Sequence, residues 1–582
     1  MRAVRVLPDV PAIDKEFDYL VPEVLGDQVR VGTLVRIDLH GRRVGGWVVE
    51  DGVDPPAGIA LKPLAKVTGW GPPADVIELA RWAAFRWAGR AAALLRAASP
   101  DRAVRHLPRA PRSAAGPDAS VSVSAVGRDP AIAEALAGGT NVLRWPPATD
   151  PFPVLLAAAT LGPVLVLHPS VAIAAAMAGR LHRAGVEVAS FPDEWAAARA
   201  GGTSVVGARR AALAPVPGLA AVVVLDAHAE AYQEERAPTW NAVEVAAERA
   251  RRAGVPCVLV SPAPPLELVA NRRVVTVDPA AERRGWPVFE VVDRRADDPR
   301  TGLFSERVVQ LVRDGGRVVC VLNRAGRARL LACSACGELA RCERCDAAVA
   351  QLDASLVCGR CGESRPVVCA TCGNQRLKIL RPGVARAREE LEALAGRPVV
   401  EITAASDANE HGDGARVLVG TEAVLHRVAR ADTVVFLDFD QELVAPRYRA
   451  AEDALGLLAR AARMVRGRAR GGRVAVQTRL PDHVVVEAAR RSDPSLVTGA
   501  EWPRREMLRL PPAVALARVS GAGAEVFAAA LAALGMDGLE VLGPAEAGWL
   551  VKAPNHDVLA TALAATRRPP GRLRIEVDPR RV

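Results

Sequence analysis

Lysine is nearly absent from this chain of 582 residues. Its positions are Lys15, Lys62, Lys66, Lys378 and Lys552, so arginine supplies almost all of the positive charge. The stretch from residue 67 to residue 377 contains no lysine at all. A P-loop needs a lysine that reaches the β- and γ-phosphates of a bound nucleotide. An α/β domain within that stretch therefore lacks the residue on which such a loop depends.

Long apolar runs and a leader-type N-terminus are also missing. No stretch of about 18 or more apolar residues occurs, as a membrane-spanning helix would need. The first residues, MRAVRVLPDV, contain no signal-peptide core. We therefore expect a cytoplasmic protein with no membrane partner. The net charge of +10 at neutral pH indicates a polyanionic partner.

The length favours several domains, and the order of predicted elements divides the chain. Short strands broken by Pro and Gly come first, and two helical stretches follow. Val/Leu-rich runs separated by helices then recur in two blocks, which is typical of parallel, doubly wound sheets. The fold class that we predict is multidomain α/β, with a β-rich N-terminal domain, two α/β lobes, a cysteine-rich insertion in the second lobe and a small α/β C-terminal domain. The predicted boundaries are 1–98 for the N-terminal domain, 99–119 for a linker, 120–302 for the first lobe, 303–332 and 373–485 for the second lobe, 333–372 for the insertion and 486–582 for the C-terminal domain.

Eight of the 10 cysteines stand in C-x-x-C pairs. The pairs are Cys333 and Cys336, Cys342 and Cys345, Cys358 and Cys361, and Cys369 and Cys372. Each pair places two thiols on one turn, and a structural zinc ion takes four ligands in a tetrahedron, so the pairs supply two sites. Three of the pairs are followed by Gly337, Gly362 and Gly373, and the fourth is followed by Asp346. These residue types tolerate the left-handed backbone that such a turn needs.

Disulfides and an iron–sulfur cluster are the alternative interpretations of these cysteines. The chain has no secretory signal, and the spacing matches neither ferredoxin pattern, so both are disfavoured. The spacing alone leaves open whether consecutive or nested pairs share an ion. The remaining Cys257 and Cys320 lie in apolar runs and are predicted to be core residues. The insertion also carries arginines that could form a basic surface, and an ordinary solvated face is the alternative for them: Arg341, Arg344, Arg360, Arg365 and Arg376.

Several strings along the chain resemble the PriA family of replication restart proteins. They are FDYLVPE, VLNRAGRA, the complete spacing C-x2-C-x5-C-x2-C-x12-C-x2-C-x7-C-x2-C, GTEAVL, LDFDQELVAPRYRAAE, LRLPPAVALARV, VLGPAE and LRIEVDP. The resemblance covers nearly the whole chain. It implies that the two α/β lobes are RecA-like helicase lobes and that residues 1–98 form a domain that binds the 3′ end of DNA.

The resemblance also implies which residues form the sites. The outer Cys pairs hold one zinc ion and the inner pairs hold the second: Cys333, Cys336, Cys369 and Cys372 for the first, and Cys342, Cys345, Cys358 and Cys361 for the second. An aromatic ring and a carboxylate of the F-D-Y string contact the terminal nucleotide, and here these residues are Phe17, Asp18 and Tyr19. An ordinary strand with one aromatic side chain in the core is the alternative for this string.

The chain departs from the family where ATP should bind. The place of the P-loop, 145–155, reads WPPATDPFPVL, so prolines replace glycines and remove amide donors. The acidic D-E-x-H motif reads L-D-A-H, which leaves Asp226 and His228 as remnants and puts Asp226 one position from the metal-binding place. Two more motifs, at 261–264 and 464–471, are altered. The sequence thus supports two Zn²⁺ ions as cofactors but gives no intact site for ATP and Mg²⁺.

We predict a replication restart protein that recognises stalled or abandoned DNA forks and recruits primosome and replisome components without helicase activity. Its DNA partners are then forked and single-stranded DNA. The resemblance implies primosome components, the loader of the replicative helicase and single-strand binding protein as its protein partners. The linker at 99–119 is too short for the family's winged-helix domain, which we expect to be lost. Two alternatives stay open: an active ATP-dependent 3′–5′ DNA helicase of the primosome, and a zinc-ribbon DNA-binding protein of repair or transcription.

Overall fold

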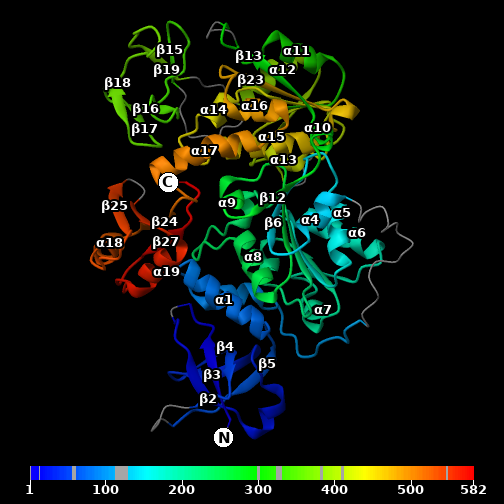
Figure 1. The fold of residues 1–582 in the computed structure, drawn as a ribbon, viewed down its shortest axis with the longest axis vertical. Coiled ribbons are helices and arrows are strands. Elements are labelled where there is room, and N and C mark those ends of the chain that lie inside the picture. Colours follow the sequence, from blue (N-terminus) through cyan, green and yellow to red (C-terminus); the bar gives the residue numbers. More distant parts are fainter. Residues whose placement is uncertain are drawn as a thin grey trace.

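The elements of the chain form separate sheets that follow one another along the sequence (Figure 1). The structure, a computed structural model, describes residues 2–11, 13–54, 60–111, 129–297, 302–322, 331–379, 384–407, 412–545 and 548–581. The end of the predicted linker and most of the string VLNRAGRA lie outside these residues. Within these ranges, no helix has the length and apolarity that crossing a lipid bilayer requires.

The N-terminal unit is an antiparallel sheet with the strand order β2-β1-β4-β3-β5. Its strands are β1 (Ala3–Pro8), β2 (Phe17–Leu20), β3 (Thr33–Leu39), β4 (Arg42–Asp51) and β5 (Lys66–Trp70), and α1 (Ala74–Arg86) and α2 (Ala91–Ala98) follow them. Side chains alternate along β3, where Val35 and Ile37 are buried and Arg36 is exposed, as a sheet with one covered face requires. The Trp47 indole N–H donates to Ser99 Oγ at 2.9 Å and fixes the end of α2 against the sheet.

The first lobe is a parallel sheet with the strand order β12-β6-β11-β10-β7-β9-β8. Its strands are β6 (Thr140–Arg144), β7 (Val164–Leu167), β8 (Val188–Phe191), β9 (Ser204–Gly207), β10 (Ala221–Leu225), β11 (Cys257–Ser261) and β12 (Arg273–Thr276). Its helices are α4 (Pro130–Ala135), α5 (Phe152–Ala159), α6 (Val171–Arg183), α7 (Trp195–Ala200), α8 (Ala242–Ala253), α9 (Leu266–Val269) and α10 (Pro279–Gly285). Helices cover both faces of the sheet, so strands such as β10 are apolar and buried along their whole length.

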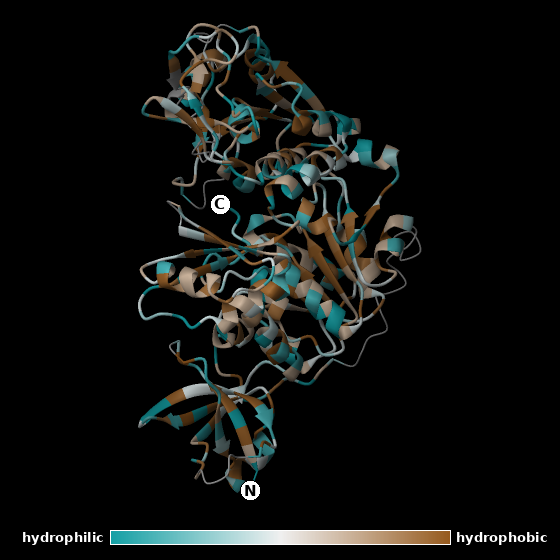
Figure 2. Cartoon of the chain, turned by 60° about the vertical axis from the view of Figure 1, so that its left-hand side comes forward, coloured by the Kyte–Doolittle hydropathy of each residue, from teal (hydrophilic) through white to brown (hydrophobic). Residues whose placement is uncertain are grey.

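The second lobe is a parallel sheet with the order β13-β23-β22-β14-β21-β20, and its apolar strands form a second hydrophobic layer in Figure 2. Its strands are β13 (Val288–Asp293), β14 (Val318–Val321), β20 (Val399–Ile402), β21 (Val417–Gly420), β22 (Thr433–Phe436) and β23 (Arg473–Thr478). Its helices are α11 (Glu306–Arg313), α12 (Val384–Ala395), α13 (Ala423–Arg427), α14 (Asp440–Leu443), α15 (Ala450–Met464), α16 (Val484–Arg491) and α17 (Ser495–Leu508). Strand β13 lies in the range that we predicted for the first lobe, yet it pairs with β23.

The C-terminal unit is an antiparallel sheet with the order β25-β26-β24-β27. Its elements are β24 (Ala515–Ser520), α18 (Ala524–Ala532), β25 (Glu540–Ala545), β26 (Gly548–Ala553), α19 (His556–Ala565) and β27 (Arg574–Val577). This unit also contacts the N-terminal part of the chain. Arg86 of α1 pairs with Asp578 at 3.2 Å, and the two side chains are largely shielded from solvent. Residues nearly 500 positions apart therefore hold the two ends of the chain together.

A buried ionic cluster joins the two lobes to α17. The Arg505 guanidinium, which is 1% exposed, contacts Glu452 of α15 and lies 3.1 Å from Glu267 of α9. The Tyr448 ring covers it at 4.7 Å, and Glu501 approaches within 3.5 Å. Burial and the neighbouring Glu267 raise the pKa of Glu452. Arg505 is the cation that pairs with this buried carboxylate, and Arg449 also favours its ionised form.

We predict that Arg505→Met weakens the lobe interface, because it leaves the buried carboxylate of Glu452 without its paired cation. The expected loss is about 3–5 kcal/mol of unfolding free energy. Arg504→Met is the matched control, because Arg504 is 34% exposed and pairs with Glu501 from the solvent side. The control should cost about 0–1 kcal/mol. Urea unfolding followed by circular dichroism measures both variants, and equal losses would contradict the prediction.

Candidate metal sites and nucleotide cleft

The C-x-x-C pairs lie on turns of one geometry. The residue after each pair is left-handed, with φ of 76° at three positions and 62° at the fourth: Gly337, Gly362, Gly373 and Asp346. In each turn, the amide of this residue donates to the carbonyl of the first cysteine with N···O of 2.9 or 3.0 Å. A backbone amide also donates to a cysteine sulfur at 3.4 Å in the first and third turns. The left-handed residues predicted from the sequence are thus confirmed, and each turn presents two sulfurs to one side.

The turns bring the sulfurs into two groups of four. The outer pairs form one group, Cys333, Cys336, Cys369 and Cys372, and the inner pairs form the other, Cys342, Cys345, Cys358 and Cys361. Within each group the sulfurs lie within 4.8 Å of one another, and none of the cysteines is in a disulfide. The shortest S···S distances between pairs are 3.5 to 3.6 Å. Sulfurs about 2.3 Å from a tetrahedral zinc ion would lie about 3.8 Å apart, so both groups could hold such an ion.

The cysteine segment is fastened to the second lobe through its inner group. Its strands are β15 (Leu331–Cys333), β16 (Val349–Leu352), β17 (Ser355–Cys358), β18 (Ser364–Pro366) and β19 (Leu377–Ile379). The Ala348 amide donates to the Val444 carbonyl at 2.6 Å. The Arg360 guanidinium donates to the carbonyls of Cys345 and Ala445 at 3.1 and 3.0 Å. Arg360 therefore bridges the inner metal group to the lobe.

The basic surface predicted for this segment is largely absent, which corrects the sequence analysis. Three of the arginines pair with carboxylates of the same segment: Arg341 with Asp346, Arg344 with Glu363 and Arg365 with Glu343. Arg360 is used for docking. Among the described residues, only Arg376 of the five is exposed without a carboxylate partner. Local ion pairs thus neutralise most of the charge that the sequence places here.

The loop between β6 and α5 lies where the sequence indicates a degenerate P-loop, at 145–155. Two of its central backbone amides have partners inside the protein. The Ala148 amide donates to the Gly285 carbonyl at 3.0 Å, and the Thr149 amide donates to the Pro146 carbonyl at 3.1 Å. The prolines of the loop have no N–H to offer: Pro146, Pro147, Pro151 and Pro153. A phosphate nest needs several free amides that point into one concavity, and the amides of Ala148 and Thr149 are bonded elsewhere.

A carboxylate of the chain occupies the N-terminus of α5. Asp150 Oδ1 accepts from the Phe152 amide at 3.1 Å, and Arg180 of α6 donates to both oxygens at 3.0 and 2.5 Å. Arg180 also covers the Phe152 ring at 4.0 Å. Burial alone would raise the pKa of Asp150, but Arg180 and the Phe152 amide bring it below its ordinary value. The negative charge that a helix N-terminus attracts is therefore supplied by Asp150 itself.

Asp226, the remnant of the acidic motif, is bound to the opposite lobe. Arg463 of α15 donates to both of its carboxylate oxygens, one of them at 2.6 Å, and His168 Nε2 lies 3.5 Å away. Burial would raise the pKa of Asp226, but Arg463 and His168 hold it well below its usual value. Its φ of 51° places it beyond the extended strand β10. Strand alternation therefore does not set the direction of this side chain.

The second lobe reaches further into the same cleft. Arg463 Nε lies 3.4 Å from the Pro147 carbonyl, and the Arg468 amide donates to the Trp286 carbonyl at 3.0 Å. A Cβ on Gly467 would stand 2.6 Å from the Arg284 carbonyl. The altered motif at 464–471 thus packs directly on the first lobe. The two lobes are therefore in direct contact beside the loop at 145–155.

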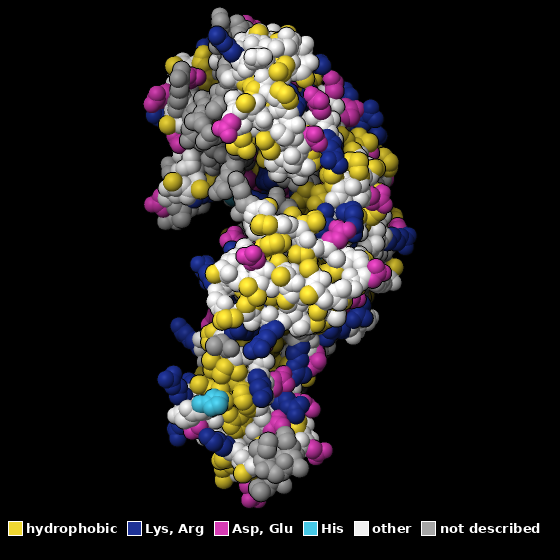
Figure 3. All heavy atoms as spheres, turned by 90° about the vertical axis from the view of Figure 1, so that its left-hand side faces the viewer, with side chains coloured by type: hydrophobic (Ala, Val, Ile, Leu, Met, Phe, Trp, Pro, Cys, Tyr) yellow, Lys and Arg dark blue, Asp and Glu magenta, His cyan; other side chains and the backbone are white. Residues whose placement is uncertain are grey.

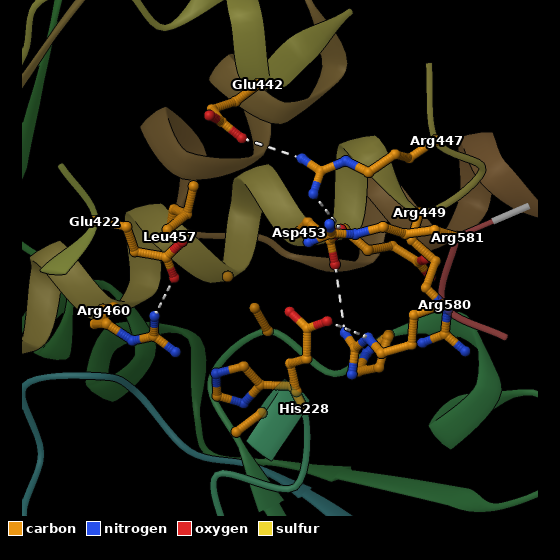
Figure 4. Close-up of a pocket in the computed structure, with 16 residues that line it drawn as sticks. His228, Glu422, Glu442, Arg447, Arg449, Asp453, Leu457, Arg460, Arg580 and Arg581 are labelled. Carbon is orange, nitrogen blue, oxygen red and sulfur yellow. Dashed lines mark hydrogen bonds and ion pairs between the residues drawn. The ribbon is translucent and has the colours of Figure 1, made fainter. Parts of the chain in front are cut away.

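His228, the second remnant, borders a charged cavity between the lobes (Figure 4). Its Nδ1 lies 3.0 Å from Ser261 Oγ, and burial lowers the pKa of its imidazole to about 4. Guanidinium groups line this cavity, and most of them face carboxylates: Arg447 with Glu442 and Asp453, Arg460 with Glu422, and Arg580 with Asp453. The charges of the cavity therefore largely balance one another and do not select an anion.

The F-D-Y string forms strand β2 and divides between two faces. Tyr19 is buried in the sheet core, and its hydroxyl donates to the Asp38 carbonyl at 3.0 Å. Phe17 packs partly against the same core. Asp18 points to the other face, where Arg5 Nε donates to it at 2.9 Å. Tyr19 is therefore an aromatic side chain of the strand core, which is the alternative given for this string. Asp18 is the member of the string that faces away from the core.

Sequence reasoning missed the side chains that fill the cleft. Asp150 had a local signal, because an acidic residue before a proline at the start of an apolar run is typical of a helix N-terminus. Arg463 had no such signal, since its partner Asp226 lies 237 residues away. The contact exists only after both lobes have folded and met.

Two family models match the ends of the chain. The 3′DNA-binding domain (3′BD) matches residues 5–100, and the primosomal protein N C-terminal domain matches residues 506–580. Two solved structures are similar in fold. They are the Escherichia coli DExH-box NTPase HrpB, with 15% identity, a TM-score of 0.32 and coverage of 66% of this chain and 44% of that one, and a DEAD box protein from the hyperthermophile Methanococcus jannaschii, with 9% identity, a TM-score of 0.30 and coverage of 64% and 87%. Scores at this level carry no information on function.

Curated relatives extend the match between the two family models. The Replication restart protein PriA of Bacillus subtilis is 28% identical over 358 residues, which cover 56% of this chain and 44% of the relative, so that alignment spans less than half of the relative's length. The probable replication restart proteins PriA of Mycobacterium tuberculosis (strain CDC 1551 / Oshkosh) and Mycobacterium leprae are both 29% identical. The alignment with the Mycobacterium tuberculosis protein covers 89% of this chain and 86% of that protein. The alignment with the Mycobacterium leprae protein covers 94% of this chain and 91% of that protein. Two terminal family models and alignments over nearly the whole chain show that this protein belongs to the PriA family of replication restart proteins.

Proposed function

We propose that this protein recognises DNA forks that expose a 3′ end and recruits replication proteins to them without working as an ATP-driven motor. Membership in the PriA family supports the DNA and restart parts of the proposal. Primosome components, the loader of the replicative helicase and single-strand binding protein are the protein partners that we propose. In this assignment residues 1–98 bind the DNA end, and the two lobes form a fixed body behind it.

The filled cleft is the observation that carries the proposal. A motor of this class needs amides and a lysine around the phosphates, a carboxylate for Mg²⁺ and an arginine that acts on the transferred phosphate. Here the amides of Ala148 and Thr149 donate to backbone carbonyls, and the Asp226 carboxylate pairs with Arg463. Removing a clamp of this kind takes away much of the transition-state stabilisation of phosphoryl transfer. A nucleotide would also have to displace the ion pair that joins the lobes.

The N-terminal sheet offers the charges that a DNA end requires. Exposed cations that form no ion pair in the described structure lie on or beside β3 and β4: Arg36, Arg42, Arg43 and Lys66. Figure 3 shows Lys and Arg side chains around this end of the molecule. Asp18 stands on the outer face of the sheet edge and is oriented by Arg5. Cations suit the phosphates, and a fixed carboxylate suits a base edge or a 3′-hydroxyl.

The metal that we infer for both cysteine groups is zinc. An all-sulfur set of four ligands in a closed tetrahedron is typical of structural zinc. The segment that holds them has only short strands of its own, so a bound ion would supply a large part of its folding free energy. We assign the ions a structural role, in which they keep the segment folded and docked on the second lobe through Arg360.

We predict no ATP hydrolysis above background in the presence of forked DNA, because the phosphate site is occupied by the chain. A coupled phosphate-release assay measures the rate. Asp226→Ala, which removes the carboxylate left in the cleft, should give the same rate as the unaltered protein. DNA-stimulated turnover that disappears in this variant would identify the protein as an active motor and reject the proposal.

We predict that Asp18→Ala weakens binding to a fork with a free 3′-hydroxyl leading strand by about tenfold, the effect of losing one charged hydrogen bond. Binding to blunt duplex should stay unchanged. Glu50→Ala is the matched control, since Glu50 also pairs with Arg5 but is 50% exposed. Fluorescence anisotropy with labelled forks gives the affinities. An equal loss on the fork and on the blunt duplex would contradict the role given to Asp18.

We predict that Cys342→Ser lowers the zinc content from about two ions to about one ion per chain. The inner group loses a ligand, so its part of the segment should also become sensitive to protease. Cys320→Ala is the control, because Cys320 is buried in β14 and lies outside both groups. Plasma mass spectrometry counts the metal. An unchanged count in Cys342→Ser would contradict the assignment.

A further inference from the structure

The two cysteine groups differ in how well their sulfurs are shielded from solvent. In the outer group, Cys336 and Cys372 are exposed, and each is the second cysteine of its turn. The residues before them, at 334–335 and 370–371, are exposed as well, so both turns face solvent. In the inner group, three cysteines are at most 4% exposed and the fourth is half-buried. A small reagent therefore reaches sulfur more easily in the outer group than in the inner group.

Apolar side chains and a guanidinium cover the inner group. Three of its cysteines belong to one buried apolar cluster with Val349 and Leu356, and the fourth packs against that cluster. Arg360 stands in the third turn, where its amide donates to Cys358 Sγ at 3.4 Å and its Nη1 donates to the Cys345 carbonyl at 3.1 Å. A cation close to a thiolate stabilises the negative charge and makes the sulfur a weaker nucleophile. The inner sulfurs are therefore shielded in two ways.

The outer sulfurs lie in short pairs that connect the first turn to the fourth. Cys333 Sγ is 3.5 Å from Cys372 Sγ, and Cys336 Sγ is 3.6 Å from Cys369 Sγ. Each pair combines an exposed sulfur with a buried one, since Cys333 is 0% and Cys369 is 6% exposed. A sulfenic acid condenses with a nearby thiol to a disulfide. An oxidised sulfur of either exposed cysteine therefore has a second sulfur within reach in the opposite turn.

We propose that Cys336 and Cys372 are oxidation sites, at which a peroxide converts the outer group into a disulfide and releases its zinc ion while the inner group keeps its own. Sulfur that binds a metal is thiolate, and susceptibility to oxidation follows thiolate character and exposure. The inference rests on the zinc ions of the proposed function, but not on its DNA-binding or ATP parts.

The reaction needs two steps and one peroxide. The thiolate of Cys372 attacks an oxygen of hydrogen peroxide, the O–O bond breaks, and a sulfenic acid and a hydroxide form. The thiolate of Cys333 then attacks the sulfenic sulfur, so that the S–S bond forms and a second hydroxide leaves. Two electrons pass from the two thiolates to the peroxide, and the hydroxides take up protons from water. The ion has then lost two of its four ligands, which leaves no closed site. The same steps apply to Cys336 with Cys369.

The oxidised product leaves the two ends of the segment joined. Either disulfide connects the first turn to the fourth, beside the pairing of Leu331 with Ile379 and of Cys333 with Leu377 between β15 and β19. The inner group keeps its four ligands and stays docked on the second lobe through Arg360. Oxidation thus removes one ion without detaching the segment, and a thiol reductant with added zinc restores the outer site.

Zinc release from the full chain tests the proposal. The protein, which should hold about two ions by plasma mass spectrometry, is treated with excess hydrogen peroxide while a chromogenic chelator records free zinc. One ion should leave about tenfold or more faster than the other. After the first ion has left, peptide mass spectrometry should find a disulfide between the first and fourth turns. The four inner cysteines should all be open to alkylation once the chain is denatured.

Arg360→Met uncovers the inner group, so the second ion should leave about threefold or more faster, with the first rate unchanged. Arg344→Met is the matched control, because Arg344 stands in an inner turn but is 54% exposed. It should release both ions at the rates of the unaltered protein. An unchanged second rate in Arg360→Met would overturn the protection assigned to this residue.

Three outcomes with the unaltered protein would overturn the proposal itself: equal release rates of the two ions, no release by peroxide, or a disulfide within the inner group after the first ion has left. Fewer ions than about two before peroxide is added would instead overturn the metal assignment, and this inference with it. The metal count before oxidation thus separates the two failures.

Discussion

The ion pair between Asp226 and Arg463 limits how far the two lobes can separate. It joins the end of β10 in one lobe to α15 in the other, within the cleft that a motor of this fold opens and closes. A carboxylate buried in this way is stable only while its arginine stays in place. Opening the cleft would break this pair and expose the neighbouring contact of Arg463 with Pro147. The two lobes are therefore joined in this structure by an ion pair between Asp226 and Arg463.

Other ionic contacts stabilise the first lobe and its joint with the second. Asp150 and Arg180 satisfy the N-terminus of α5 within the first lobe, and the Arg505 cluster fastens α17 to both lobes. Two further parts surround the lobes. One is the N-terminal sheet, which presents cations and Asp18, and the other is the cysteine segment, whose sulfurs are arranged for metal.

The sequence predicts the two cysteine groups from residue type and spacing. For the cleft it predicts only which residues of an ATP site are missing. Spacing and residue type at Gly337 and Asp346 dictate left-handed turns, because few other residues adopt that backbone without strain. Continuous apolar runs likewise predict the buried parallel strands, since both faces of such strands are covered. A short apolar run such as VLLAAAT does not by its pattern distinguish a strand from a helix, and most of it lies in α5 in the structure. Proline and missing lysine indicated that the phosphate loop is lost.

Contacts between distant segments could not be predicted from local patterns. Strand β13 joins the second sheet through its pairing with β23, which no local pattern records. Tyr19 faces the core because of the register in which β2 pairs with β1. A shift of one residue in that register would turn Asp18 to the core and Tyr19 to the outer face. The sequence does not show that arginines of the cysteine segment pair with carboxylates of the same segment, because those contacts depend on the fold.

The central claim is that the loop at 145–155 keeps its amides bonded inside the protein whether or not nucleotide is present. Hydrogen exchange of this loop, followed by mass spectrometry with and without Mg²⁺–ATP, measures that directly. We predict slow exchange of the amides of Ala148 and Thr149 in the free protein and no change on addition of nucleotide. Fast exchange in the free protein that becomes slow when Mg²⁺–ATP is added would contradict the account.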